Sequence, residues 1–188
     1  MIPIQNIYYM LSYAFQILNE QGYRNIATEQ FNNTAELMAA ILEKGIANQL
    51  KRGLCKEYIP QTEALSSLRG KIDIAESIKT QSMLRKQLIC TYDEFSVNST
   101  MNQIIKSTVE LLLCSNISKK RKKNLRKLMI YFGEVDFIDL HTVNWNVQYN
   151  RNNHTYRMLI SICYLVVKGL LQTQSDGSKK LMDFLDEQ

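Results

Sequence analysis

The sequence predicts an α+β fold that is mostly helical, with a small antiparallel sheet in the middle of the chain. Turn-forming residues are scarce, since only 7 Gly and 2 Pro occur among 188 residues, whereas these two types usually make up about 12% of a protein. Apolar residues recur with a helical period over 6–53 and again from about 99 onward. Between these parts the pattern changes to the alternation of a strand.

Two helices are predicted before the sheet. Apolar residues follow helical spacing over 6–18, with Asn6 as a cap and Gly22 soon after the end. The second helix begins at Asn33 and closes at Gly53. Each presents one apolar stripe, which is the pattern of a helix packed on a core.

The predicted sheet comes from three short segments. Residues 56–60 indicate an edge strand, and 61–68 a polar connection. Residues 71–74 alternate as a strand does, directly after Gly70, and 87–95 mix β-branched and aromatic residues. We expect the three segments to pair as antiparallel strands.

Helices return in the second half of the chain. One is capped by Ser99 or Asn98, a basic helix covers 118–131, and the most apolar helix covers 153–171. We expect the last of these at the centre of the core. No internal repeat is found.

The chain is expected to form one domain over 1–172. Residues 173–178 have the composition of a linker, and 179–188 begin a new amphipathic element. That element either docks back as a short terminal helix or starts a further domain. The domain organisation is therefore 1–172 followed by a separate segment, 173–188.

Composition and charge indicate a cytoplasmic protein. The net charge is +5. The sequence has four cysteines, with no C-x-x-C pair, and only two histidines, so we expect free thiols and no zinc site. The N-terminus has no basic segment and no cleavage site of a signal peptide. The longest apolar run is far shorter than a membrane span, so no membrane partner is expected.

A search for catalytic residues finds none. No G-x-S-x-G, H-E-x-x-H or P-loop pattern occurs. Asp73, Glu76 and Lys79 have the residue types of a metal-dependent nuclease, but their order and spacing do not put two ligands and a lysine on one strand. We expect these three on a solvated strand edge and predict no metal site.

A run of cations is the most distinctive charge feature. Seven Lys or Arg residues occupy nine positions, 119–127. Five of them share a helix face by their spacing: Lys119, Lys122, Lys123, Arg126 and Lys127. Such a face either binds phosphates, with salt-dependent and sequence-independent affinity, or is a solvated face of like charges.

Five segments along the chain occur in a recognisable order. The first three are IPIQNIYYMLSYAF at 2–15, KRGLCKEYIPQTE at 51–63 and LRGKIDIAESI at 68–78. The last two are TYDEFSVNSTMNQIIKSTVELL at 91–112 and YRMLISICYLVV at 156–167. In this order they resemble McrC, the partner subunit of the McrBC modification-dependent restriction system, and the resemblance extends over nearly the whole chain.

The resemblance implies a regulatory domain over 1–172 that binds an McrB-like AAA+ GTPase ring and stimulates GTP hydrolysis, for cleavage of DNA with modified cytosine. McrC-like proteins carry a C-terminal nuclease domain, and this sequence ends where that domain would begin. We therefore expect 173–188 to start the missing domain and the chain not to be catalytic alone. No cofactor is expected in this chain, whereas GTP and Mg²⁺ are expected on the partner and the nuclease domain.

Arg69 is the first candidate for stimulating the partner GTPase. A partner accelerates a ring NTPase when it supplies a cation to the reacting phosphates, and Arg69 stands directly before Gly70 and a strand. Lys71 and Arg52 are weaker candidates. The alternative for Arg69 is a turn residue with its charge in solvent. The alternative for the whole chain is a stand-alone nucleic-acid-binding protein that uses the basic helix.

Overall fold

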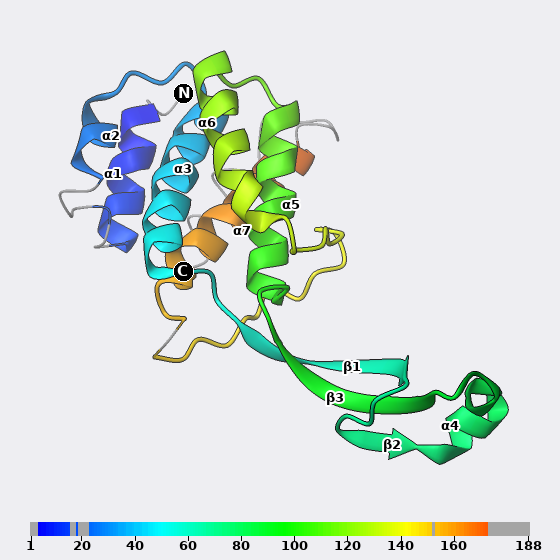
Figure 1. The fold of residues 1–188 in the computed structure, drawn as a ribbon. Coiled ribbons are helices and arrows are strands. Elements are labelled where there is room, and N and C mark those ends of the chain that lie inside the picture. The colour runs from blue at the N-terminus through cyan, green and yellow to red at the C-terminus, as the bar shows by residue number, and fades with distance from the viewer. Residues whose placement is uncertain (1–3, 16–17, 19–22, 152, 173–188) are drawn as a thin grey trace. The chain divides into compact units, whose positions relative to one another are not determined.

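The computed structural model describes residues 4–15, 18, 23–151 and 153–172. These residues form two compact units. Unit 1 contains the described residues up to Cys55 and from Thr100 onward, and unit 2 is Lys56–Ser99. Unit 2 is thus inserted into the sequence of unit 1 (Figure 1). The predicted α+β class, mostly helical with a small sheet in mid-chain, is confirmed.

The regular structure of unit 1 is helical. Its elements are α1 (Ile4–Ala14), α2 (Arg24–Thr28), α3 (Thr34–Arg52), α5 (Thr100–Cys114), α6 (Lys119–Met129), the 3₁₀ turn η3 (Ile130–Phe132) and α7 (Tyr156–Gln172). Helix α3 contacts α1, α2, α5, α6 and α7. Figure 1 shows it in the middle of the unit, with α1 and α2 on one side and α6 on the other.

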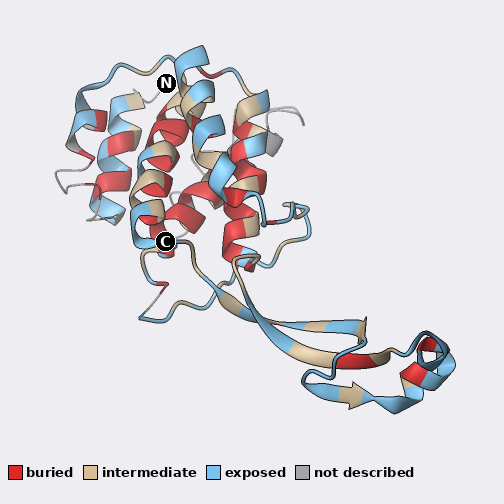
Figure 2. Cartoon of the chain, viewed as in Figure 1, coloured by how far each residue is buried: buried red, intermediate tan, exposed pale blue. Residues whose placement is uncertain are grey.

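The core of unit 1 lies where α3, α5 and α7 meet, and Figure 2 shows their inner faces buried. Ile41 on α3, Ile104 on α5 and Ile162 on α7 are fully buried. At Gly45, a Cβ atom would stand only 2.4 Å from Leu159 Cδ2, so a larger residue here would force the Leu159 side chain of α7 to shift. The helix over 153–171, expected at the centre of the core, is therefore correctly placed, although it begins at Tyr156.

The predicted ends of α3 are confirmed. Asn33 Oδ1 accepts a hydrogen bond from the backbone N–H of Glu36 at 2.7 Å, as an N-cap does. Gly53 follows the last turn with φ +93°, a conformation that favours glycine. Both signals were local in the sequence, which is why they predicted the ends correctly.

Unit 2 is a three-stranded antiparallel sheet with a small helical cap. Its elements are β1 (Glu57–Leu65), β2 (Lys71–Asp73), α4 (Ile74–Lys79), the 3₁₀ turn η2 (Ser82–Arg85) and β3 (Leu88–Ser96). Strand β3 lies between β1 and β2. Glu57 pairs with Ser96 and Leu65 with Leu88, so β1 and β3 match over their full length.

Three local expectations in the first half of the chain were wrong. Helix α1 begins at Ile4, so Asn6 lies inside it and is not its cap. The segment Gln61–Leu65 is strand, not connection, because a two-sided solvated edge strand has the polar composition of a loop. Ile74 begins α4 instead of ending β2, because Asp73 Oδ1 accepts the backbone N–H of Glu76 at 2.9 Å and caps the helix.

Some expectations fall on residues outside the described part of the chain. These are Gly22 after the first helix and the segment 173–188, with its linker and start of a further domain. Within the described residues, no helix combines the length and apolar character that crossing a membrane requires.

Candidate functional site

Arg69 lies in a turn that only glycine closes. The turn joins β1 to β2, and Gly70 adopts φ +67°. A Cβ atom at this position would stand 2.3 Å from the Thr91 carbonyl oxygen and 2.7 Å from Tyr92 Cβ. Both contacts are too short for any side chain, so only glycine allows the turn to lie directly against β3. The position of the turn then determines the position from which the Arg69 side chain extends.

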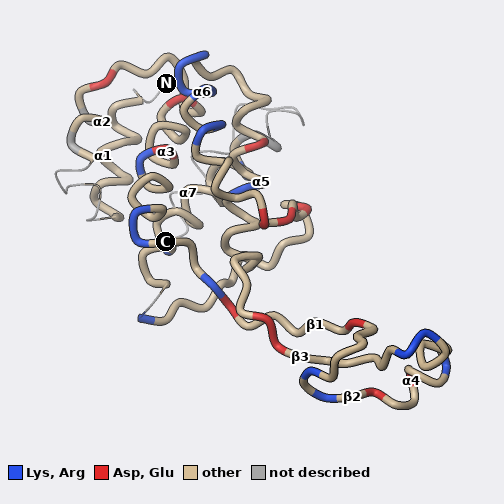
Figure 3. Tube along the Cα trace, viewed as in Figure 1, with Lys and Arg blue, Asp and Glu red and all other residues tan. Residues whose placement is uncertain are grey.

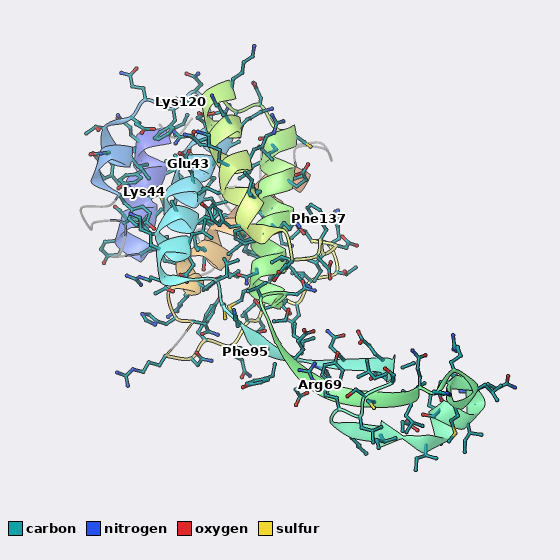
Figure 4. The ribbon with its side chains drawn as sticks, in the orientation of Figure 1. Glu43, Lys44, Arg69, Phe95, Lys120 and Phe137 are labelled. Carbon is teal, nitrogen blue, oxygen red and sulfur yellow. The ribbon has the colours of Figure 1, made fainter. Side chains whose placement is uncertain are left out.

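The guanidinium of Arg69 stacks on an aromatic ring of the central strand. Its Cζ lies 4.3 Å from the centroid of the Tyr92 ring, and Figure 4 shows Arg69 against the sheet of unit 2. The Tyr92 hydroxyl in turn donates to Glu63 Oε2 on β1 at 3.3 Å. Desolvation, and then the neighbouring Glu63 carboxylate, raise the pKa of Tyr92, so its hydroxyl keeps the proton that it donates. The stack thus aligns an exposed cation with the sheet.

The structure brings two of the three predicted cations together. Lys71 is exposed and begins β2 opposite Thr91, so Arg69 and Lys71 lie on either side of Gly70 where the turn enters the strand. Arg52 is instead the last residue of α3 and belongs to unit 1. It is exposed, as expected for the end of a helix, but it is not part of the same turn.

Arg52 lines a small cleft of unit 1. The cleft holds about 300 Å³ and is bordered by Tyr23, Gly45, Asn48, Gln49, Lys51, Arg52, Thr155, Met158 and Leu159. The buried Gln49 amide is already bonded, because it donates to the Gly53 carbonyl at 2.9 Å and accepts from Thr155 Oγ1 at 2.8 Å. The cleft therefore has a mixed polar and apolar lining, with two cations, Lys51 and Arg52, at its border.

Unit 2 also exposes an apolar surface that the sequence analysis did not identify. The helical cap presents Ile74 (61% exposed), Ile78 (62%), Met83 (52%) and Leu84 (81%) to solvent. Figure 2 shows α4 and its surroundings mostly in the exposed colour. We call these four residues the apolar tip. Clustered exposed apolar side chains are typical of protein interaction sites, whereas the helical spacing of Ile74 and Ile78 alone would have predicted burial.

The predicted basic helix exists, and Ser118 caps it. Ser118 Oγ accepts the backbone N–H of Arg121 at 3.3 Å. The five cations of the predicted face are all on α6, four of them exposed and Lys122 half-buried. Figure 3 shows the basic positions along this helix.

One cation of α6 has a structural task instead. Arg121 Nη1 lies 2.9 Å from Glu43 Oε2, Nη2 lies 2.8 Å from Glu29 Oε2, and Nε lies 3.7 Å from Glu36 Oε1. Burial acts to lower the pKa of Arg121, but the hydrogen bonds to Glu43 and Glu29 outweigh it and leave that pKa raised. Arg121 therefore anchors α6 to α3 as a permanent cation.

Glu76 and Lys79 lie in helix α4 and Asp73 is its N-cap, so the three residues do not form the solvated strand edge that was expected. Asp73 caps α4, and Lys79 Nζ lies 3.3 Å from Glu76 Oε2 as an exposed pair within the helix. Across the described residues, no group of three His, Cys, Asp or Glu side chains is arranged to hold a metal ion. The four cysteines are free thiols.

Comparisons with known proteins give the family. The model of a family described as "McrBC 5-methylcytosine restriction system component" matches residues 5–186. The chain is 30% identical, over 191 aligned positions, to the "Type IV methyl-directed restriction enzyme EcoKMcrBC" of Escherichia coli (strain K12). The alignment covers 97% of this chain and 53% of that protein, so the chain spans about half the length of its curated relative.

Two solved structures share the fold. A chain of the cryo-EM structure of the Thermococcus gammatolerans McrBC complex superposes with a TM-score of 0.64 at 20% identity, covering 95% of this chain and 60% of that one. A refined half-complex of T. gammatolerans McrB AAA+ hexamers with bound McrC gives a TM-score of 0.61 at 20% identity, covering 81% and 39%. The extent of the family match settles the assignment: this chain belongs to the McrBC 5-methylcytosine restriction system component family.

Proposed function

We propose that this chain is the McrC-type regulatory part of a restriction enzyme, which binds an McrB-type AAA+ GTPase ring and stimulates its GTP hydrolysis. The observation that carries the proposal is the Arg69–Tyr92 stack in the turn fixed by Gly70. Arg69 supplies the stimulating cation, Lys71 a second positive charge in the same turn, and Arg52 a weaker candidate in unit 1.

The stack suits a cation that must act on another protein. A guanidinium carries five N–H donors in one plane, and stacking on Tyr92 covers one face of that plane while its edges stay available. Among the described residues, Arg69 is in no ion pair. No described residue therefore neutralises its charge, and the stack on Tyr92 restricts the direction of the side chain. A side chain that is already restricted loses less conformational entropy when it contacts a partner.

The apolar tip supports a protein partner for the same unit. An AAA+ ring that is to receive Arg69 needs a contact area beyond one side chain, and the four residues of the apolar tip offer it. The T. gammatolerans structure that shares this fold is described as McrB AAA+ hexamers with bound McrC. We therefore propose unit 2 as the part that binds the ring.

In this proposal, the nucleotide and the metal ion are not bound by this chain. GTP and Mg²⁺ are held by the partner ring, and cleavage of modified DNA is carried out by a nuclease domain. Residues 1–172 act as the regulatory part. Unit 1 then serves as the scaffold into whose sequence unit 2 is inserted.

The test measures GTP hydrolysis by the cognate McrB-type protein with and without the chain. Arg69→Ala should reduce the stimulated rate to near the basal rate, since an arginine supplied by a partner protein accelerates hydrolysis by roughly 10³-fold or more in other GTPases. Arg69→Lys keeps the charge but loses the planar fork, so it should restore little. Lys71→Ala and Arg52→Ala are the matched controls, with smaller losses expected. Stimulation unchanged by Arg69→Ala, with binding intact, would remove Arg69 from the mechanism.

A further inference from the structure

The side chains of α6 divide into two groups with different surroundings. The docking side consists of Arg121, Asn124 and Leu125. Leu125 is fully buried, and Asn124 Nδ2 donates to Glu43 Oε1 on α3 at 2.9 Å, beside the Arg121 ion pairs. These three contacts of α6 with the rest of unit 1 therefore lie on one side of the helix.

The remaining cations all lie on the opposite side. At about 100° per residue, the six positions fall within an arc of about 160° centred opposite Arg121. We call this the cationic face: Lys119, Lys120, Lys122, Lys123, Arg126 and Lys127. In the part of the chain that the structure describes, none of the six is in an ion pair.

The cationic face is unfavourable for the helix itself. Like charges at i,i+4, such as Lys119 with Lys123 and Lys123 with Lys127, destabilise a helix. Lys119 and Lys120 also stand in the first turn, where the helix dipole disfavours positive charge, and that turn has no acidic residue. Arg121 and Leu125 hold the helix in place against this repulsion. Local rules are broken in this way mainly where a function needs the broken arrangement.

The charge spacing fits duplex DNA. The six cations lie along about 12 Å of helix axis at a rise of 1.5 Å per residue, and duplex DNA carries one negative charge per about 1.7 Å. The end of the helix offers no competing site, because the Glu36 carboxylate already accepts from the Ser118 backbone N–H and hydroxyl, both at 2.7 Å. Phosphates would therefore meet the side chains of the face, not the helix N-terminus.

We propose that the cationic face of α6 binds the phosphate backbone of duplex DNA without sequence preference, and so gives this restriction-system component a hold on its substrate that is separate from unit 2. DNA is favoured over an acidic protein surface because a restriction system acts on DNA. The proposal rests on the family and on α6, not on Arg69. It predicts a contact that positions the duplex and does not read the modified base.

The test is fluorescence anisotropy of a labelled, unmethylated DNA duplex with the full chain across a salt series. Six phosphate contacts predict a slope of log K against log salt of about −5 (0.9 × 6), and an affinity loss of about 10³-fold between 50 and 200 mM salt. The same duplex with methylated cytosines should bind equally well.

The test variant removes four exposed cations, lowering the net charge from +5 to +1: Lys119→Gln, Lys123→Gln, Arg126→Gln and Lys127→Gln. A control with the same net charge removes four exposed cations elsewhere: Lys44→Gln, Lys51→Gln, Lys79→Gln and Arg85→Gln. The test variant should lose about 3.6 (0.9 × 4) of the salt slope, and the control should keep it. Replacing Lys119, Lys123 and Lys127 by Arg should keep DNA binding, because charge alone is needed.

Three outcomes overturn the proposal. The first is equal loss of DNA affinity in the test variant and the control. The second is a test variant that binds DNA normally but loses affinity for the McrB-type GTPase, which assigns the face to a protein. The third is binding of single-stranded RNA in preference to the duplex. GTPase stimulation without DNA, measured on the same variant, should stay unchanged, so failure here is distinct from failure of the Arg69 proposal.

Discussion

The Tyr156 hydroxyl donates a 2.8 Å hydrogen bond to Asn102 Oδ1 in the interior of unit 1. The same hydroxyl accepts the backbone N–H of Cys55 at 2.8 Å, and Asn102 Nδ2 donates to the Cys55 carbonyl at 2.9 Å. These bonds form a closed ring of three residues. Tyr156 lies at the start of α7, Asn102 lies near the start of α5, and Cys55 is the last residue of unit 1 before unit 2 begins. Unit 2 is inserted between Cys55 and α5, so this ring joins the two points where unit 1 is interrupted.

Tyr156→Phe should therefore destabilise unit 1. The change removes the hydroxyl that bonds Asn102 Oδ1 and the Cys55 N–H, and losing hydrogen bonds in the interior costs about 1–3 kcal/mol. Urea unfolding followed by circular dichroism measures the loss. Tyr131→Phe is the matched control, because Tyr131 is 67% exposed, and an exposed hydroxyl should change stability by less than about 0.5 kcal/mol. Equal effects of the two changes would show that the ring is not a source of stability.

The buried thiol of Cys163 should lower the free energy of unfolding at alkaline pH. This thiol is fully buried on α7, and burial raises its pKa to about 12. The unfolded chain releases the proton near pH 8.5, so the folded form binds more protons above that pH. Stability from this group is complete below about pH 8.5 and is lost as the pH rises toward 12, at up to about 1.4 kcal/mol per pH unit.

The measurement compares urea unfolding at pH 8 and pH 10 for the wild type and Cys163→Ala. The variant should be less stable at pH 8 but should lose less stability on going to pH 10. Cys114→Ala serves as control, since Cys114 is exposed. A parallel loss in all three proteins would assign the alkaline effect to other groups.

Local signals in the sequence correctly predicted both ends of α3 and the start of the basic helix. Asn33 and Gly53 bound α3, and Ser118 begins the basic helix, because cap and helix lie within three residues of each other. The signal failed at Gln61–Leu65, where a polar strand is kept in the sheet by its pairing with β3. Pairing partners some 30 residues apart leave no local trace in composition.

The candidate site was predictable only in part for the same reason. Arg69 and Gly70 are adjacent, so a turn with an exposed cation could be expected. The stack on Tyr92 depends on the register of β2 and β3, which the sequence pattern does not specify. Arg121 was one of seven similar cations in the sequence, and only the position of three glutamates distinguishes it from the cationic face.

Arg121→Ala should loosen α6, whereas Lys120→Ala should not. Both remove one positive charge from the same helix, but Arg121 leaves three carboxylates without their shared cation. Breaking such a half-buried network costs about 2–3 kcal/mol, and the exposed Lys120 should cost less than about 0.5 kcal/mol. Hydrogen exchange of the α6 amides and urea unfolding measure the difference. If the two variants exchange alike, the anchor assigned to Arg121 does not exist.

Gly70→Ala should distort the turn that carries Arg69. The new Cβ meets the Thr91 carbonyl oxygen in a backbone conformation with positive φ, and we expect a loss of about 2–3 kcal/mol together with loss of GTPase stimulation. Gly53→Ala is a matched control, since Gly53 also has positive φ but no atom within 4 Å of the added Cβ. It should cost backbone strain of about 1–3 kcal/mol but leave GTPase stimulation unchanged. Stimulation retained in Gly70→Ala would show that Arg69 does not depend on the turn.

The apolar tip should contribute to binding the partner ring without contributing to folding. Met83→Ser with Leu84→Ser removes two exposed side chains of η2, so the urea midpoint should stay nearly constant. Affinity for the McrB-type GTPase should fall by about 10-fold or more, because buried apolar anchors dominate protein interfaces. Ile130→Ser is the control, since Ile130 is 76% exposed but lies in unit 1. If affinity falls equally in the control, or does not fall in the tip variant, the apolar tip is not the contact with the ring. The role of Arg69 would then be tested independently of the apolar tip.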